Sequence, residues 1–318
     1  MDSMMPVRLA PALRPENVAA ALTPGEPVMP DIGARSVAAA ADFLEASRTG
    51  SRRQRPRMGR APSGSGACDG ETVLRMILAI AEEYPCYGHR RVTMELRRRG
   101  IRVNRKRVRR IMRAEGLCAL PSRRRTKDAD FGIERPAPKY PNLVLGIEID
   151  RPNQVWAADI TCIGLETEFV FLAVILDVFT RRCIGWSLGR NGHEGHIMRA
   201  LRKALRERAG KDLAGLIHHS DQGIVYASRE YVEFLAGRNI RISMSRRGNP
   251  YDNAYVERFF ETLKYEDVYL NGYHGFDDAL DNIRKFIDDV YNTKRLHSAI
   301  GYRPPGELEK AAASITIA

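Results

Sequence analysis

The first part of the chain carries apolar residues at helical spacing. The pattern predicts three short helices, at 71–83, 90–100 and 105–116. Asn104 is placed to cap the third helix, and Gly116 is placed to end it. Three helices joined by short turns predict a small all-α domain at 71–120.

The second part carries apolar runs that are typical of strands. Strands are predicted at 154–164, 168–179, 182–189, 213–219 and 240–245. Helices are predicted at 193–209, 228–239, 252–266 and 277–292. Three successive strands followed by alternating helices and strands predict an α/β domain at 145–310, built on a five-stranded sheet.

Two stretches show neither pattern clearly. Residues 1–66 are rich in Ala, Pro, Gly, Ser and Arg, and we expect them to be mostly poorly ordered. Residues 121–144 are predicted to be a linker between the two domains.

Positive charge is concentrated in the all-α part of the chain. Residues 71–127 contain 17 Lys or Arg against 5 Asp or Glu, a net +12 that equals the net charge of the whole chain. Such a concentration favours a polyanionic partner, DNA or RNA. Five cations of the third predicted helix are candidate DNA contacts: Arg105, Lys106, Arg109, Arg110 and Arg113. We interpret the domain as a helix-turn-helix that binds DNA; the alternative is a small bundle with a solvated basic face.

Other features argue against a membrane or secreted protein. We find no apolar run long enough to cross a bilayer and no signal-peptide pattern at the start of the chain. The five cysteines form no CxxC pair, which suits ordinary thiols in a reducing cytoplasm. We therefore expect a cytoplasmic location and no membrane partner.

Three carboxylates form the candidate site. Asp159 lies inside the first predicted strand ("WAADIT"), and Asp221 lies where the fourth one ends ("HHSDQG"). If these strands are neighbours, the two carboxylates face each other. Glu257 lies near the start of the helix predicted at 252–266, so it can point at the sheet. Three oxygen ligands of this kind can hold two Mg²⁺ ions, which suits in-line displacement at phosphorus.

Each of these residues also has a plain structural interpretation. An Asp at a strand end is usually a turn residue, and we assign that role to Asp177. Glu257 could form an ordinary ion pair on its helix face. For His218 and His219 we expect one buried, hydrogen-bonded ring and one ring at the edge of the site.

The motifs around these residues together resemble a known family. "WAADIT", "HHSDQGIVYAS", "GNPYDNAYVERFFETLKYE" and "YNTKRLHSAIGYRPPGEL" are similar to the integrase core of insertion-sequence transposases, and most similar to the second-frame (OrfB) proteins of the IS-three family. "YGHRRVTMELRRRG" and "VNRKRVRRIMRAEGL" resemble the helix-turn-helix of the same family, so the resemblance runs from about residue 71 to 310. One departure is Leu296, which stands where this family often has proline.

The resemblance implies a fold and a reaction. The fold would be an RNase H-like mixed sheet flanked by helices, related to retroviral integrases and preceded by the helix-turn-helix. The enzyme would be a DDE transposase that cleaves DNA at insertion-sequence ends and transfers the strand. Asp159 would bridge two Mg²⁺ (or Mn²⁺) ions, with Asp221 and Glu257 completing one site each. Lys264 would contact the DNA end, and the stretch from Asn249 to Asn253 would lie near DNA.

The resemblance also implies partners. These are the terminal inverted repeats of the element, target DNA, a first-frame (OrfA) protein and further copies of this chain on DNA, in a bacterial cytoplasm at the nucleoid. Two other functions stay open. One is a non-catalytic DNA-binding regulator of transposition, and the other is an RNase H-like nuclease.

Overall fold

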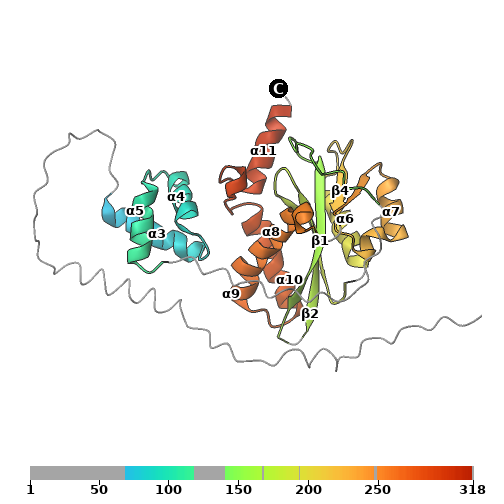
Figure 1. Ribbon diagram of the computed structural model, residues 1–318. Coiled ribbons are helices and arrows are strands. Elements are labelled where there is room, and N and C mark those ends of the chain that lie inside the picture. Colours follow the sequence, from blue (N-terminus) through green and yellow to red (C-terminus); the bar gives the residue numbers. More distant parts are fainter. Residues whose placement is uncertain (1–68, 118–139, 167, 193, 247–248, 317–318) are drawn as a thin grey trace, which may run out of the picture. The chain divides into compact units, whose positions relative to one another are not determined.

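The computed structural model describes residues 69–117, 140–166, 168–192, 194–246 and 249–316 (Figure 1). The segment 1–66 and most of the linker expected at 121–144 lie outside the described residues. Within the described part of the chain, no helix is both long and apolar enough to span a bilayer.

The helix-turn-helix module consists of three helices, α3 (Gly70–Glu83), α4 (His89–Arg98) and α5 (Arg105–Ala114). Asn104 caps α5 as expected, because its Oδ1 accepts a hydrogen bond from the Lys106 N–H at 2.8 Å. The helices enclose a small apolar core, whose fully buried members include Val73, Ile77, Ile80, Val92, Leu96 and Val108.

The α/β domain contains one mixed sheet of five strands. The strands are β1 (Val155–Gly164), β2 (Phe169–Asp177), β3 (Cys183–Gly189), β4 (Ile217–Ser220) and β5 (Arg241–Met244). They lie side by side in the order β3-β2-β1-β4-β5. The first three form antiparallel pairs, whereas β4 and β5 add to β1 in parallel. The mixed five-stranded sheet that the resemblance implies is confirmed, and the first and fourth strands are neighbours, which was the condition set for Asp159 and Asp221 to face each other.

Helices cover both faces of this sheet. They are α6 (Glu194–Glu207), α7 (Arg229–Ala236), α8 (Ala254–Leu263), α9 (Tyr269–Asn271), α10 (Phe276–Lys285) and α11 (Pro305–Thr316). Figure 1 shows α8 and α10 on one side of the sheet and α6 and α7 on the other. The alternation along β1 matches this layering: Val155 and Ala157 join the core with α8 and α10, while Trp156 and Ala158 join the core with α6 and α7.

Two of the helices differ from the prediction in their details. The helix expected at 252–266 begins with a 3-10 turn (Pro250–Asn253), continues as α8 and ends in a π-helical turn (Lys264–Val268). The helix expected at 277–292 likewise passes from α10 into a π-helical turn (Phe286–Tyr291). The hydrophobic pattern predicted both helices but not these changes of pitch.

The C-terminal stretch explains Leu296, the residue that replaces the family's proline. Its side chain is fully buried in the helix-turn-helix core. Its N–H donates to the Tyr87 hydroxyl at 2.8 Å. Proline has no N–H and could not make this bond. Glu266 ties the same regions together through ion pairs with Arg91 (3.1 Å) and Arg295 (2.6 Å).

Candidate active site

Asp159 and Asp221 lie at matching positions on neighbouring strands. The parallel pairing of β1 and β4 ends with Ala158 opposite Ser220, so the two aspartates are the next residues on each strand. Asp159 has the same parity as Ala157, which places it on the sheet face covered by α8 and α10. Both aspartates are half-buried. The sheet therefore places these two residues next to each other in register, which is the arrangement needed for their carboxylates to face each other.

Glu257 lies in the first turn of α8, above the same face. The start of this helix is bonded to β1, because the side-chain amide of Asn253 donates to the Ala158 carbonyl at 3.2 Å. Glu257 follows Asn253 by four residues, so the two side chains lie on one side of the helix. Glu257 therefore lies in the part of α8 that is bonded to β1, and it is half-buried.

The two aspartates have local hydrogen-bond partners and a shared neighbour. Asp159 accepts from the Ile160 N–H at 2.8 Å, and Asp221 accepts from the Gly223 N–H at 2.9 Å. The phenol of Tyr226 is buried nearby. Burial raises its pKa well above the usual value, and the negative charges of Asp159 and Asp221 raise it further. The Tyr226 phenol therefore lies within electrostatic range of both carboxylates.

The three carboxylates do not form a closed ligand cluster. In the described part of the chain, no three His, Cys, Asp or Glu side chains lie close enough together to hold a metal ion. Asp159 and Asp221 follow matched positions of neighbouring strands, and Glu257 is supplied by a separate element.

Polar atoms around the aspartates fit a positively charged group. Seven buried side-chain atoms have no hydrogen-bond partner among the described residues, and three of them are oxygens: Gln222 Oε1, Tyr226 Oη and Asn253 Oδ1. All three flank the aspartates in sequence or in space. The other four are nitrogens, and they lie elsewhere, on Arg181, Trp186 and Arg208. Carboxylates surrounded by unsatisfied oxygens provide the hard donor set that Mg²⁺ or Mn²⁺ takes.

The two histidines before Asp221 are both structural. His218 and His219 are each only 1% exposed, so the expectation of one ring at the edge of the site was wrong. His218 accepts from the Tyr231 hydroxyl at 2.8 Å, and burial lowers its pKa to about 3. Because both faces of β4 are covered, neighbouring side chains that point in opposite directions are both buried.

The turn that precedes α8 is held by an ion pair. Arg246 contacts Asp252 with two guanidinium nitrogens, each at 3.0 Å, and with its backbone N–H at 2.8 Å. The Asn142 amide adds a bond to the same carboxylate at 2.9 Å. Hydrogen bonding to Arg246 is the largest favourable cause that holds the Asp252 pKa down, to about 2.

Lys264 and Asn249, the other two residues of the catalytic core that the sequence predicted, lie on either side of the 3-10 turn and α8. Lys264 is the first residue of the π-helical turn after α8 and is half-buried. Asn249 precedes the 3-10 turn, and its carbonyl accepts from the Asp252 N–H at 3.4 Å. Their predicted DNA contacts stay predictions.

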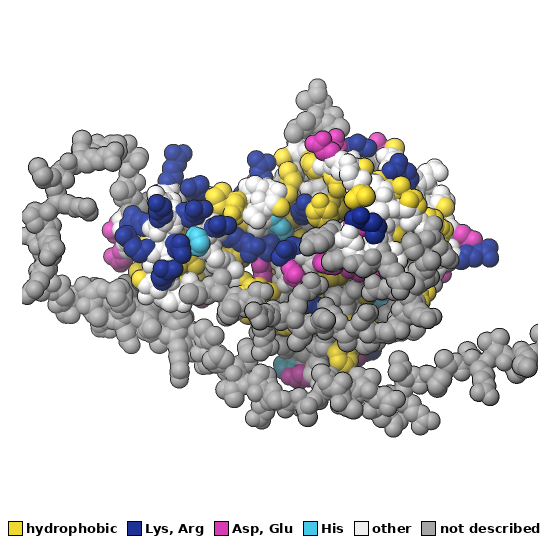
Figure 2. Space-filling model, viewed as in Figure 1, with side chains coloured by type: hydrophobic (Ala, Val, Ile, Leu, Met, Phe, Trp, Pro, Cys, Tyr) yellow, Lys and Arg dark blue, Asp and Glu magenta, His cyan; other side chains and the backbone are white. Residues whose placement is uncertain are grey.

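The five predicted cations of α5 are all exposed. Figure 2 shows Lys and Arg side chains gathered over the helix-turn-helix module. Two arginines at the end of α4 have structural partners instead. Arg98 pairs with Glu307 (2.8 Å), and Arg99, directly after the helix, pairs with Glu95 (2.9 Å) and Glu83 (2.6 Å). The charge available to a polyanion therefore lies on α5 more than on α4.

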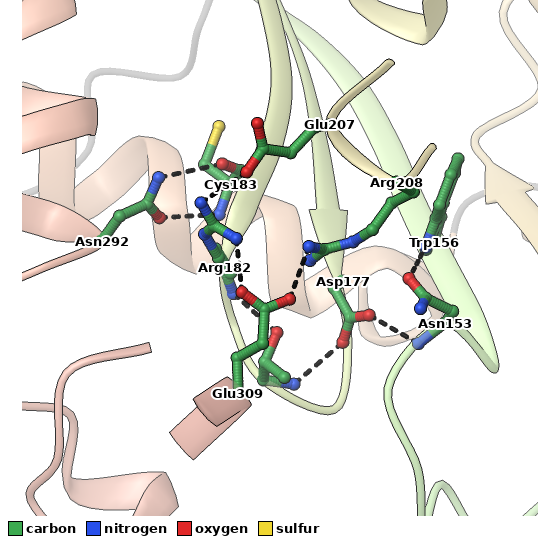
Figure 3. Close-up of polar contacts among 10 residues, drawn as sticks. Asn153, Trp156, Asp177, Arg182, Cys183, Glu207, Arg208, Asn292 and Glu309 are labelled. Atoms are coloured by element: carbon green, nitrogen blue, oxygen red, sulfur yellow. Dashed lines mark hydrogen bonds and ion pairs between the residues drawn. The ribbon is translucent and has the colours of Figure 1, made fainter. Parts of the chain in front are cut away.

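Asp177 belongs to a separate, structural cluster (Figure 3). It is fully buried and accepts from the backbone N–H groups of Asn153 (2.6 Å) and Thr180 (2.9 Å). Burial raises its pKa. These bonds fix the turn between β2 and β3, in line with the structural role expected for it.

The chain matches known families along most of the described part. Family models match at residues 69–125 (HTH-like domain), 149–250 and 238–305 (both integrase core domain). A mixed five-stranded sheet covered by helices, with the integrase-core and HTH-like matches, defines a polynucleotidyl transferase that acts on DNA.

Known proteins of similar sequence identify a more specific family within this class. The transposase for insertion sequence element IS904 of Lactococcus lactis is 36% identical over 244 residues, which cover 76% of this chain and 94% of that protein. The transposase for insertion sequence element IS629 of Shigella sonnei is 32% identical over 231 residues, 72% of this chain and 76% of that protein. The HTLV-2 integrase catalytic core domain, solved in complex with magnesium, is 19% identical, covers 50% of this chain and 97% of that chain, and superposes with a TM-score of 0.39. The chain belongs to the insertion-sequence transposases, the DDE enzymes of DNA transposition and integration.

Sequence reasoning missed several polar residues around the aspartates. Asn253 looked like part of a loop before the helix, and Tyr226 and Gln222 looked like ordinary motif residues. The signal that could have identified Asn253 is its position: an Asn directly before a helix normally caps it, but here its side chain makes no cap bond and reaches β1 instead.

Proposed function

We propose that Asp159, Asp221 and Glu257 are the catalytic residues of this transposase and that they hold two divalent cations, Mg²⁺ or Mn²⁺. The observation that carries this proposal is the matched position of Asp159 and Asp221 on β1 and β4, under the helix that bears Glu257. Asp159 lies on the central strand, between β2 and β4. That position suits a ligand shared by both ions, with Asp221 and Glu257 each completing one side.

The reaction follows from this arrangement. When bound, the cations supply charge neutralisation at the attacking and leaving oxygens of an in-line displacement. In the first step a P–O bond forms from water and a P–O bond breaks at the element end, which frees a 3′-hydroxyl. In the second step this 3′-oxygen forms a P–O bond with target DNA as a target P–O bond breaks. The protein side chains hold the ligand geometry, and Lys264 binds the phosphate backbone of the DNA end.

The helix-turn-helix would supply recognition of the element. We propose that α5 contacts the terminal inverted repeats through its exposed Arg105, Lys106, Arg109, Arg110 and Arg113, with Asn249 close to DNA in the core. Two ends must meet before strand transfer, so several copies of the chain would assemble on DNA. A first-frame (OrfA) protein would join them, in the bacterial cytoplasm at the nucleoid.

A cleavage and strand-transfer assay tests the proposed site. Labelled duplexes that carry the element ends are incubated with wild type, Glu257→Gln or Glu261→Gln, in Mg²⁺ and in Mn²⁺. Glu261 is the matched control, because it lies one turn further along α8 and pairs with Arg258 at 2.8 Å. We expect products from wild type and Glu261→Gln but none from Glu257→Gln, with DNA binding equal in all three.

The other outcomes separate the remaining functions. Equal activity of Glu257→Gln and wild type would overturn the assignment of the site. Cleavage of RNA–DNA hybrids without strand joining would identify a nuclease. Binding to the element ends without any product, with and without the first-frame protein, would identify a regulator.

A further inference from the structure

We propose that Asn253 and His219 are positioning residues that clamp the start of α8 to β1 and β4 and so set how tightly the three carboxylates bind their cations. This inference rests on the proposed function of Asp159, Asp221 and Glu257. Each one joins the element that carries one acidic residue to the element that carries another.

The Asn253 bond connects α8 with β1. Its side-chain amide donates to the Ala158 carbonyl at 3.2 Å, one residue before Asp159. A carbonyl can only accept, so the amide nitrogen must face it and the amide oxygen points away. That oxygen is buried and has no partner among the described residues. Asn253 is itself only 5% exposed, and its side chain makes no cap bond to its own helix.

The His219 bond connects the same turn with β4. His219 Nε2 lies 3.0 Å from the Asp252 carbonyl, and Nδ1 lies 2.8 Å from the Ser243 hydroxyl. Nε2 also lies 3.1 Å from the Ser245 hydroxyl. Because a carbonyl can only accept, the contact with Asp252 assigns the ring proton to Nε2, and Nδ1 then accepts from Ser243. Ser243 also accepts from the Leu143 N–H at 2.8 Å, which fixes its hydroxyl direction. The ring is therefore locked two residues before Asp221.

The two bonds meet at adjacent residues of one turn. Asp252 is held to β4 through its carbonyl and to Arg246 through its carboxylate, and Asn253 is held to β1. Glu257 follows one helical turn later. Two side-chain bonds therefore fix the start of the helix that carries Glu257, while Val256 and Phe259 pack its body into the core. Because the carboxylates repel one another without a cation, a loosened α8 would let Glu257 move away.

The expected effect is on cation affinity. Partners that orient metal ligands typically cost about 10- to 100-fold in metal affinity when they are removed. Asn253→Ala should therefore raise the Mg²⁺ and Mn²⁺ concentrations for half-maximal effect by about ten-fold. His219→Phe should act in the same direction, while His219→Gln, which retains a donor for the Asp252 carbonyl, should lie closer to wild type.

Thermal unfolding of the full chain gives a readout that does not depend on activity. The melting temperature is measured against MgCl₂ and MnCl₂ for wild type, Asn253→Ala and Asn253→Leu, and the midpoint of the cation-dependent rise is compared. Asn253→Leu keeps the branching at Cγ without the polar atoms and serves if Asn253→Ala does not fold. Strand transfer is then measured at the same cation concentrations.

Asn292→Ala is the matched control. Asn292 is another 5% exposed asparagine of this domain, and its amide bonds Cys183 N–H (3.0 Å) and Cys183 carbonyl (2.9 Å) on β3, as Figure 3 shows. Loss of this amide in Asn292→Ala should lower the melting temperature measured without added cation. It should leave unchanged the cation concentration at the midpoint of the cation-dependent rise. A residue with a purely structural role would behave like Asn292.

The outcomes separate this inference from the proposed function. A cation midpoint raised in Asn253→Ala or Asn253→Leu, but not in Asn292→Ala, supports the positioning role. A wild-type midpoint in both Asn253 variants, with the cation response abolished by Asp159→Asn, overturns the positioning role and leaves the proposed site intact. A wild type that shows no cation response overturns both.

Discussion

Two polar clusters of the same domain differ in how they satisfy their charges. In the cluster of Figure 3, Glu309 on α11 lies between the guanidinium groups of Arg182 and Arg208, and Asp177 accepts two backbone N–H bonds. Here carboxylates meet cations or N–H groups that the chain itself supplies. Around Asp159 and Asp221, by contrast, the chain leaves three buried oxygens without partners. In both clusters some buried polar atoms have no partner among the described residues, but they are donors on Arg208 in the first cluster and two amide oxygens and a hydroxyl in the second.

The elements that form the two clusters explain this difference. The Figure 3 cluster joins the β2–β3 turn, the end of α6 and α11, so its ion pairs hold separate parts of the fold together. Its unpartnered atoms are donors, Nε and Nη2 of Arg208, and not acceptors. The acidic site lies on two parallel strands at the centre of the sheet, where a carboxylate contributes little to packing. Acids placed there are costly to the fold unless they serve another purpose.

The largest expected effect comes from exchanging one aspartate in each cluster. Asp159→Asn should reduce strand transfer about a thousand-fold or more, because it removes a charged ligand of the proposed cations. It should leave the free energy of unfolding within about 0.5 kcal/mol of wild type. Asp177→Asn should do the opposite: its amide would place N–H against N–H of Asn153 or Thr180, and lower the free energy of unfolding by about 2 kcal/mol.

Urea unfolding measures the stability of both variants, and strand transfer per folded molecule measures their activity. A large loss of stability in Asp159→Asn, or a thousand-fold loss of activity in folded Asp177→Asn, would show that the two clusters are not separate in function.

The next prediction concerns the ion pairs of α11. Glu309→Gln leaves Arg208, which is 3% exposed, without its carboxylate partner at 2.5 Å. Breaking a buried pair on one side is strongly destabilising, and the partial exposure of Glu309 reduces the cost here to about 2 kcal/mol. We expect a lower melting temperature with an unchanged cation midpoint. The exposed pair Arg229–Glu233 supplies the control, since Glu233→Gln should change stability by less than about 0.5 kcal/mol.

A third prediction concerns pH. Arg246 holds the Asp252 pKa at about 2, below its usual range, so ionised Asp252 stabilises the fold above pH 4 and this contribution is lost as the pH falls through 2. Arg246→Met should therefore lower the melting temperature at pH 6. The difference from wild type should shrink as the pH falls from 4 toward 2. Melting curves across this range check it, and a constant difference would assign the effect of Arg246 to packing.

The sequence predicted the sheet and the candidate acids but not the contacts that position them. Apolar runs located all five strands, and Asp159 and Asp221 stood out because each interrupts or ends such a run. The Asn253 bond joins residues 95 positions apart, and the His219–Asp252 bond joins residues 33 apart. Neither separation leaves a periodic signal in the chain. The histidine prediction failed for a related reason, because burial of both faces of β4 depends on distant helices.

The smallest expected effect compares the two basic helices of the helix-turn-helix module. Arg109 on α5 is exposed, whereas Arg99 beside α4 is held by Glu83 and Glu95. If α5 contacts phosphates, Arg109→Ala should weaken binding to any duplex and reduce the slope of log affinity against log salt by about 0.9. Arg99→Ala should leave the slope unchanged and reduce stability slightly. Binding titrations at several salt concentrations measure both slopes. Equal slopes for Arg109→Ala and wild type would move the DNA contact away from this residue, while a reduced slope for Arg99→Ala would mean that α4 exchanges its carboxylate partners for phosphates when DNA binds.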